Sequence, residues 1–238
     1  MAAYGVPEFH AKDFFARRKR RLLDCYADWS AKKATEFVTD LAMVIHRRRL
    51  NAICGAVNVA AFRAMAYEDR RFLTGGNFTT NGKWKTAGAP NYPYRLAFWF
   101  LLREAVDRAK DGTTVHFVFD RQNVYEGGTV QEFDAIARSG VGADKIIDST
   151  KLGSLIFSNR YQDIALQAAD LLAHSWYREL VHRDQLTDER AVAMTILSDK
   201  RRAIRVFEAN DLEQLMKDAE RTAGIPLELL RKMGPAGL

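Results

Sequence analysis

Two aspartates of this 238-residue chain stand where a carboxylate is either well placed to react or costly to bury. Asp120 ends the continuous apolar run Val115–Phe119, which is typical of a buried central strand. Ligands of open α/β sheets collect at the carboxyl ends of strands, although an aspartate there could equally cap the following turn. Asp170 lies within the mostly apolar stretch Gln162–Leu180. A buried carboxylate is unfavourable unless it is paired or bound to metal, so Asp170 needs a partner.

The stretch Gln162–Leu180 is predicted to be a buried helix, because its apolar residues cover most of the helix circumference. Four polar residues fall on one narrow stripe, at about 0°, 40°, −20° and 20° around the axis: Asp163, Gln167, Asp170 and His174. The stripe is either the solvent-facing edge of the helix or a set of buried polar groups directed at a site. His174 could orient a ligand or shuttle a proton, although a histidine there more often hydrogen-bonds in the core.

Positive charge is concentrated in short runs, within a chain whose 36 lysines and arginines exceed its 30 acidic residues. Such runs face solvent or phosphate, because neighbouring like charges repel one another. A solvated helix face explains the first run equally well, and the second would also stabilise the C-terminus of the helix predicted from Asp28. We expect nucleic acid to bind through Arg17, Arg18, Lys19, Arg20 and Arg21, with help from Arg47, Arg48 and Arg49.

The remaining elements alternate between helix and strand, which predicts an α/β layered domain. Residues 1–183 are expected to form this domain, and residues 184–238 a C-terminal helical extension packed on it. Thr74–Pro93 is expected to be a loop. A hairpin is expected to turn near Gly153. The predicted helices are Ala60–Phe72, Tyr94–Lys110, Thr129–Ala137, Asp188–Arg202 and Asp211–Ala223, and the predicted strands are Asn51–Val59, Lys145–Ile147, Leu155–Phe157 and Ile204–Phe207.

Composition narrows the class of protein. A hydrophobic fraction of 47% with 28% charged residues is ordinary for a globular protein of the cytoplasm. Cys25 and Cys54 lack metal-ligand spacing and are expected to be reduced thiols. No apolar run approaches the roughly 20 residues of a membrane span, so no membrane partner is expected. Nucleophile-elbow and phosphate-loop motifs are absent from the sequence.

Three motifs together resemble the family catalogued as domain of unknown function 3800: FHAKDFF, HFVFDRQ and IALQAADLLAHSWYREL. The resemblance spans about Phe9–Leu180. It implies a ribonuclease H-like fold, with a mixed sheet flanked by helices, and a metal-dependent nuclease activity by analogy of fold. It also implies Asp120 and Asp170 as acidic active-site residues, with His10 and Asp13 as a His-x-x-Asp motif.

Members of that family usually begin with a strand that carries an Asp-Glu-Ser-Gly type motif and supplies the leading metal ligand. The sequence shows no such strand before His10. We expect this difference to reflect a start assigned too late, a shortened chain or a lost ligand.

Phosphodiester hydrolysis requires an activated water and neutralised charge on the leaving oxygen, and two divalent ions supply both. The sequence therefore predicts a metal-dependent nuclease of DNA or RNA, with His10 as a further catalytic residue. Its Mg²⁺ or Mn²⁺ would be held by the oxygen ligands of Asp120, Asp170 and Asp13. Two alternatives stay open: a catalytically inactive nucleic-acid- or protein-binding module of the same fold, and a hydrolase of a smaller phosphorylated substrate.

Overall fold

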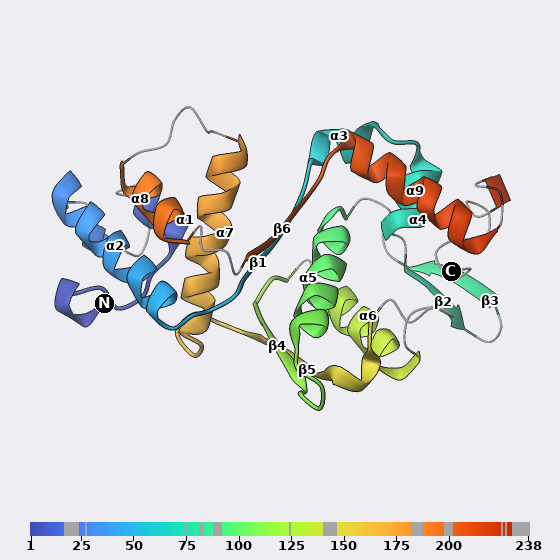
Figure 1. The fold of residues 1–238 in the computed structure, drawn as a ribbon, viewed down its shortest axis with the longest axis horizontal. Helices are drawn as coiled ribbons and strands as arrows, with labels where there is room; N and C mark the ends of the chain where they lie inside the picture. Colours follow the sequence, from blue (N-terminus) through green and yellow to red (C-terminus); the bar gives the residue numbers. More distant parts are fainter. Residues whose placement is uncertain are drawn as a thin grey trace. The chain divides into compact units, whose positions relative to one another are not determined.

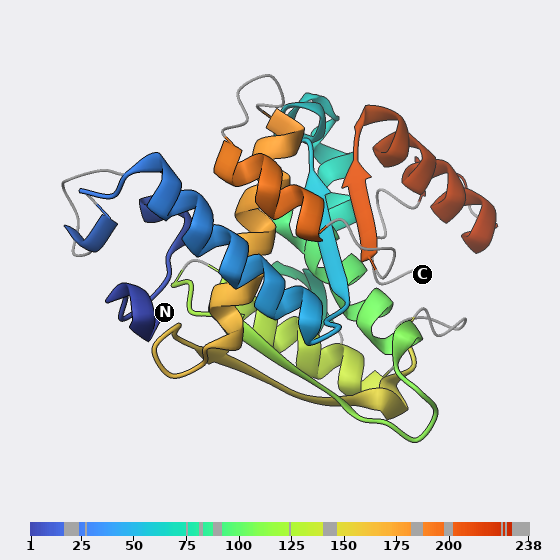
Figure 2. The same cartoon turned by 60° about the vertical axis from the view of Figure 1, so that its left-hand side comes forward.

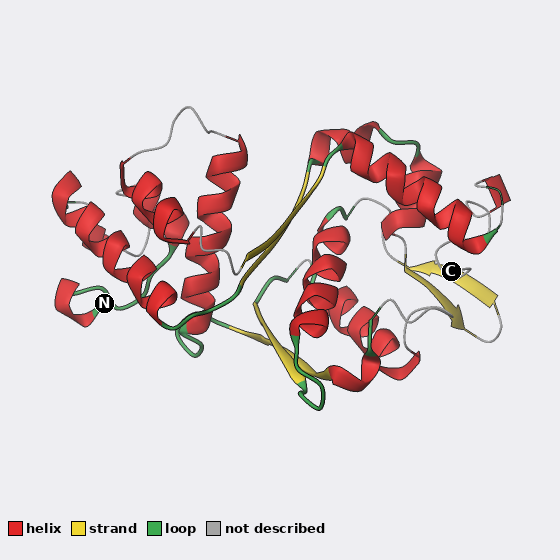
Figure 3. Cartoon of the chain, in the orientation of Figure 1, coloured by secondary structure: helices red, strands yellow, loops and turns green. Residues whose placement is uncertain are grey.

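The protein is a mixed α/β chain, seen here in a computed structural model (Figure 3). The structure describes residues 1–16, 24–26, 28–74, 76–80, 83–87, 92–123, 125–139, 147–181, 188–197, 202–224, 226 and 228–229. The chain divides into two compact units. Unit 1 comprises Met1–Cys54, Val118–Arg121 and Ile156–Ala203, and unit 2 comprises Gly55–Phe117, Gln122–Leu155 and Ile204–Leu238.

In the described residues of unit 1, four α-helices surround one apolar core (Figures 1 and 2). Helix α8 packs against both α2 and α7, and α1 packs against α7. Two short 3-10 helices belong to the same unit: η1 precedes α1, and η2 lies between α1 and α2. The bounds are η1 Ala2–Tyr4, α1 Ala11–Ala16, η2 Asp24–Tyr26, α2 Ala31–Arg47, α7 Ala165–Val181 and α8 Asp188–Leu197. The buried core includes Phe9, Phe14, Tyr26, Phe37, Val38 and Leu171.

Helix α2 begins and ends for local reasons that the sequence contains. Ser30 is the N-cap, two residues after the predicted start at Asp28, and its hydroxyl accepts the backbone N–H of Lys33 at 3.2 Å. At the other end, Arg49 adopts φ 53°, the left-handed conformation in which helices commonly terminate. Between them, Phe37, Val38 and Ala42 face the core of unit 1.

Unit 2 packs the remaining helices and one antiparallel hairpin. One apolar cluster joins α3, α5 and α9 through Phe62, Leu96 and Leu212, and Phe207 packs into it. In the hairpin, Gly76 pairs with Ala87 and Thr80 with Lys83. The bounds are α3 Val59–Ala64, α4 Tyr67–Thr74, β2 Gly76–Thr80, β3 Lys83–Ala87, α5 Tyr94–Arg108, α6 Glu126–Ser139, η3 Ser149–Lys151 and α9 Ala209–Ala223.

The other four strands form two parallel pairs, β1 with β6 and β4 with β5. Each of these strands has one end in each unit. The predicted single mixed sheet is not formed by the described residues, whose strands pair only two by two. The coarser α/β prediction is confirmed, and the ribonuclease H-like arrangement stays a prediction. The bounds are β1 Ala52–Val57, β4 Val115–Asp120, β5 Leu152–Ser158 and β6 Arg202–Phe207.

The prediction of a hairpin turn near Gly153 is wrong, and the reason is physical. It lies inside β5 and is not the turn of a hairpin. A Cβ atom at this position would lie 2.7 Å from the imidazole of His116 on the paired strand β4, so the glycine makes room for that ring. His116 Nδ1 also lies 3.0 Å from the hydroxyl of Ser154.

Several other boundaries differ from the predictions. The expected loop Thr74–Pro93 contains the β2–β3 hairpin, and the expected helix Ala60–Phe72 is divided into α3 and α4. The expected helix Asp188–Arg202 ends at Leu197, and Arg202 opens β6 instead. Residues 145–146 of the expected strand before β5 lie outside the described residues. The contacts also divide the chain differently from a boundary at residue 183, because α8 belongs to unit 1 and α9 to unit 2.

Cys25 and Cys54 do not form a disulfide. Burial raises the pKa of the Cys54 thiol, which keeps it in the neutral form. Within the described part of the chain, every helix is too short or too polar to cross a membrane.

Candidate active site

A tight turn between β5 and α7 fixes the position of Arg160. The side-chain oxygen of Asn159 accepts the backbone N–H groups of Tyr161 and Gln162, at 3.1 and 3.0 Å. The backbone N–H of Asp163 donates to the carbonyl of Asn159 at 2.9 Å. An asparagine favours such a turn because its side chain replaces a backbone acceptor. Arg160 is thereby held at the carboxyl end of a parallel strand, where ligands of α/β proteins commonly bind.

Three carboxylates meet at the guanidinium of Arg160, all within unit 1. Its Nε lies 3.2 Å from Glu8 Oε1. Its Nη1 lies 3.8 Å from Asp120 Oδ2 and 3.6 Å from Asp170 Oδ2. The two aspartates predicted as site residues are therefore brought together, one from the end of β4 and one from α7. One guanidinium cannot neutralise three carboxylates, so two negative charges remain in excess at this point.

The polar stripe of α7 is explained by what it holds in place. Gln167, only 6% exposed, accepts the backbone N–H of Phe9 at 3.0 Å and donates to the carbonyl of Arg160 at 3.0 Å. Asp170 Oδ2 accepts the backbone N–H of Ala11 at 2.8 Å. Of the two readings left open by the sequence, these residues support buried polar groups directed at a site. They connect the start of α1 to the Arg160 turn.

His174, at the far end of the same stripe, has a packing role. Its ring stacks on Phe15 of α1, with centroids 4.9 Å apart and planes 6° apart. The stripe thus changes along its length from hydrogen bonding to ring packing, and both parts join α7 to α1.

His10 and Asp13 form a second polar pair on the same segment. His10 Nδ1 and Asp13 Oδ2 are 2.7 Å apart, and each side chain is 21% exposed. A carboxylate on one ring nitrogen orients the imidazole and leaves the other nitrogen, Nε2, for proton transfer. The pair adjoins Ala11, whose backbone N–H is held by Asp170. The four predicted catalytic residues therefore form two pairs in unit 1: Asp120 and Asp170 share Arg160, and His10 contacts Asp13 one residue from the Ala11 N–H that Asp170 holds.

Sequence reasoning missed Glu8, Arg160 and Tyr161. Glu8 is buried, at 7% exposure, and its backbone carbonyl accepts the hydroxyl of Tyr26 at 3.1 Å. A hydrogen bond with Glu8 raises the pKa of the exposed Tyr161 hydroxyl. The signal that could have found two of these residues is the polar run Asn159–Asp163, which follows directly on a predicted strand and precedes α7.

The predicted three-ligand metal group, Asp120 with Asp170 and Asp13, is not assembled as one cluster. In the described residues, no three acidic, histidine or cysteine side chains are grouped as metal ligands, and Asp13 instead contacts His10. The donor chemistry of Asp120 and Asp170 nevertheless suits a divalent ion, because Mg²⁺ is often held by only one or two carboxylates plus substrate phosphates. The negative charge that remains around Arg160 also favours the binding of a cation. These two residues are the ones that would hold a metal here.

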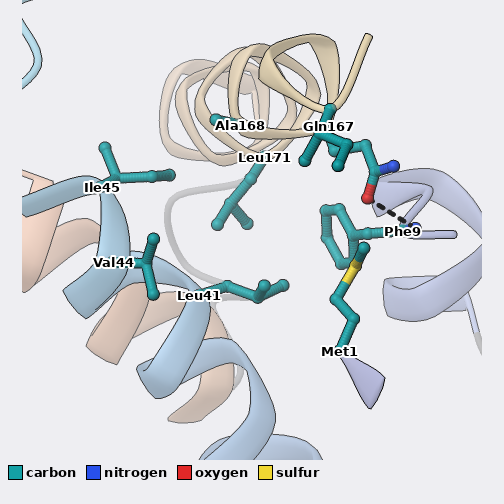
Figure 4. Close-up of a pocket in the computed structure, with 9 residues that line it drawn as sticks. Met1, Phe9, Leu41, Val44, Ile45, Gln167, Ala168 and Leu171 are labelled. Carbon is teal, nitrogen blue, oxygen red and sulfur yellow. Dashed lines mark hydrogen bonds between the residues drawn. The ribbon is translucent and has the colours of Figure 1, made fainter. Parts of the chain in front are cut away.

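An apolar pocket of about 280 Å³ adjoins this cluster within unit 1 (Figure 4). Gln167 is its one polar lining residue, and the figure shows its side-chain oxygen bonded to Phe9. None of the lining side chains is ionisable, so these side chains cannot supply acid–base chemistry. It is lined by Met1, Phe9, Leu41, Val44, Ile45, Ile164, Gln167, Ala168 and Leu171.

The two basic runs have different outcomes. The first, residues 17–21, lies outside the described residues. The second, Arg47–Arg49, is exposed at the C-terminal end of α2, as predicted. Its proposed contact with nucleic acid stays a prediction.

Comparison of the chain with protein-family models, with curated proteins and with solved structures found no match. The resemblance drawn from the sequence motifs therefore stays an expectation. The functional argument depends on the geometry around Arg160 and on the chemistry of its carboxylates.

Proposed function

We propose that this protein is a metal-dependent phosphodiesterase of ribonuclease H-like type that hydrolyses DNA or RNA. One observation carries the proposal: Asp120 and Asp170, separated by 50 positions in the sequence, converge on the single guanidinium of Arg160. Paired carboxylates from a strand end and a helix, with charge in excess, are what a divalent-ion site requires.

Asp120 and Asp170 would hold Mg²⁺ or Mn²⁺, which would polarise a phosphate oxygen and lower the pKa of a bound water. Both side chains are partly exposed, 41% for Asp120 and 27% for Asp170. Partial exposure lets a substrate reach the carboxylates. The bond from the backbone N–H of Ala11 orients Asp170.

His10 would move the proton in this reaction. Asp13 holds its Nδ1, so that Nε2 is the atom that takes a proton from the attacking water or gives one to the leaving oxygen. A neighbouring carboxylate also stabilises the imidazolium that forms when Nε2 accepts a proton. The exposed Arg47–Arg49 would contact the phosphate backbone, together with residues 17–21.

The test is cleavage of labelled single- and double-stranded DNA and RNA with Mg²⁺ or Mn²⁺, by wild type and by Asp170→Asn. Asparagine keeps an oxygen that accepts the N–H of Ala11 but loses the charge, so the fold should persist. We expect cleavage to fall by more than roughly 100-fold, the upper range for changes to groups that merely support a metal ligand. Asp111→Asn, which alters a fully exposed aspartate of unit 2, is the matched control.

A chelator should abolish cleavage by the wild type, and added Mn²⁺ should restore it. Cleavage that survives both the chelator and Asp170→Asn would contradict the proposal. If Asp170→Asn lowers the melting temperature strongly and no variant cleaves, Asp170 is a structural hydrogen-bond acceptor.

A second candidate, a catalytically inactive module that binds nucleic acid, is favoured by one specific observation. Arg160 already contacts both carboxylates that would hold the ion. This candidate predicts salt-dependent oligonucleotide binding without cleavage, and binding that Asp170→Asn leaves unchanged.

A further inference from the structure

We propose that Arg160 is a built-in competitor of the divalent ion: its guanidinium neutralises Asp120 and Asp170 until an ion displaces it. The inference rests on the proposed function, because it takes these two carboxylates as the ligands of the ion. It adds a residue and a step that the sequence motifs do not contain.

The contact distances divide the arginine into a fixed part and a releasable part. Nε lies 3.2 Å from Glu8, within hydrogen-bonding distance. Nη1 lies 3.6 and 3.8 Å from the two aspartates, beyond the 2.7–2.9 Å of a good charge-assisted hydrogen bond. Nη1 therefore neutralises these carboxylates without strong directional bonds. Little free energy is lost when Nη1 moves away from them.

The charges around Arg160 favour its displacement from the two aspartates by an ion over a permanent contact. Glu8, Asp120 and Asp170 carry three negative charges against the single positive charge of Arg160. A divalent ion bound beside the arginine would bring the cluster to neutrality. Loss of Arg160 from the cluster would undo that balance, so we expect it to stay tethered to Glu8 while Nη1 moves away.

The backbone around Arg160 is suited to such a movement of the side chain alone. Gln167 holds its carbonyl, and Asn159 holds the following two N–H groups. Glu8 is itself fixed through the hydroxyl of Tyr26 on its carbonyl. The released guanidinium group, which presents donors in a planar fork, would then be free to bind a substrate phosphate.

The experiment is a titration of the full chain with Mn²⁺, with free ion measured by electron paramagnetic resonance and no substrate present. We expect Arg160→Gln to bind Mn²⁺ about tenfold more tightly than wild type, because a competing positive charge within about 4 Å is removed. Arg160→Lys keeps the charge and should bind within about threefold of wild type. Arg121→Gln, which removes an exposed charge directly after Asp120, should change affinity less than about threefold.

Each outcome has one meaning. Equal Mn²⁺ affinity in wild type and Arg160→Gln, with binding lost in Asp170→Asn, would overturn the competition and leave the metal site standing. Absence of Mn²⁺ binding in every variant would overturn the metal site and the competition together. Tighter binding in Arg121→Gln equal to that in Arg160→Gln would reduce the effect to overall charge and also overturn the inference.

A measurement on the wild type keeps the inference testable if Arg160→Gln fails to fold. We expect Mg²⁺ to shift the NMR signals of the Arg160 guanidinium N–H groups, those of Nη1 most, assigned from their absence in Arg160→Lys, in a saturable manner. The Nε–H signal of Arg121 is the internal reference. A signal of Arg160 that stays constant while Mg²⁺ binds would show that the arginine does not respond, and would overturn the inference.

Discussion

Two arginines each organise a partly buried polar cluster, Arg95 in unit 2 and Arg160 in unit 1. Arg95 Nε lies 3.2 Å from Glu132 Oε2, and its Nη1 donates to the carbonyl of Thr74 at 2.7 Å. The indole N–H of Trp99 donates to the other oxygen of Glu132. Around Arg160, by contrast, three carboxylates share one guanidinium and the contacts to two of them are long.

The difference separates a structural cluster from a candidate site. In the Arg95 cluster, one positive charge meets one negative charge, and both side chains are at most 14% exposed. A buried pair with its hydrogen bonds satisfied fixes a conformation and leaves little for a ligand to do. In the Arg160 cluster, charge is unbalanced and Asp120 is 41% exposed. Unbalanced, reachable charge is unfavourable for the free protein and useful for binding a cation.

The largest effect on stability is expected from Arg95→Met. The methionine fills similar space but leaves the Glu132 carboxylate and the Thr74 carbonyl buried without this partner, which should cost about 3 kcal/mol of unfolding free energy. Urea denaturation at neutral pH measures it. Arg103→Met, which removes an exposed i,i+4 pair with Asp107, should change stability by less than about 0.5 kcal/mol. A small loss in Arg95→Met would contradict a structural role for this cluster.

The pH dependence of that loss sharpens the comparison. Burial raises the pKa of Glu132 above its usual 4.5, while Arg95 and the Trp99 hydrogen bond lower it. Arg95→Met should therefore raise the pKa further. A folded state that holds a proton more tightly loses stability as pH rises through its pKa, so the deficit of Arg95→Met should grow as pH rises above the raised pKa that Glu132 has in the wild type. Denaturation at several pH values measures the slope.

The parts of this comparison that the sequence could predict are those set by local periodicity. The apolar spacing of α2 and α7 and the apolar run of β4 predicted these elements, but burial was overestimated: α7 leaves Tyr177 exposed, and β4 leaves Val118 exposed. The stripe on α7 singled out Gln167 and Asp170 without deciding between a solvent-facing edge and a site. Asp120 and Asp170 could be paired because a strand end and a helix that was expected to be buried pose the same problem for a carboxylate.

The central residue of the site could not be predicted in the same way. Arg160 contacts Glu8 across a separation of 152 positions in the sequence. From the sequence alone, an arginine in a polar turn cannot be distinguished from a solvent-exposed arginine. The prediction of a single mixed sheet was wrong for a related reason, because strand pairing depends on partners that are distant in sequence. Gly153 looked like a turn because glycine has two uses, and only the neighbouring His116 decides between them.

Gln167→Leu is expected to have the next largest effect, because Gln167 connects the site to the core. The leucine would leave the N–H of Phe9 and the carbonyl of Arg160 without their partner in a buried setting, which should cost about 2 kcal/mol. Urea denaturation measures the loss, and Gln214→Leu on the exposed face of α9 is the control. A loss no greater than in the control would show that the stripe does not hold the segment before α1.

The smallest effect on stability is expected at a residue that the proposed function makes essential. Asp120→Asn removes one of three carboxylates around a single guanidinium, so relief of like-charge repulsion offsets the lost contact at 3.8 Å. The half-exposed pair is worth at most about 1 kcal/mol, and we expect a net change within about 0.5 kcal/mol. The same variant should lose Mn²⁺ binding. If Asp120 contributes to ion binding and not to stability, the Arg160 cluster differs in role from the structural Arg95 cluster. Destabilisation of Asp120→Asn by 2 kcal/mol or more would instead make the two clusters alike, both structural.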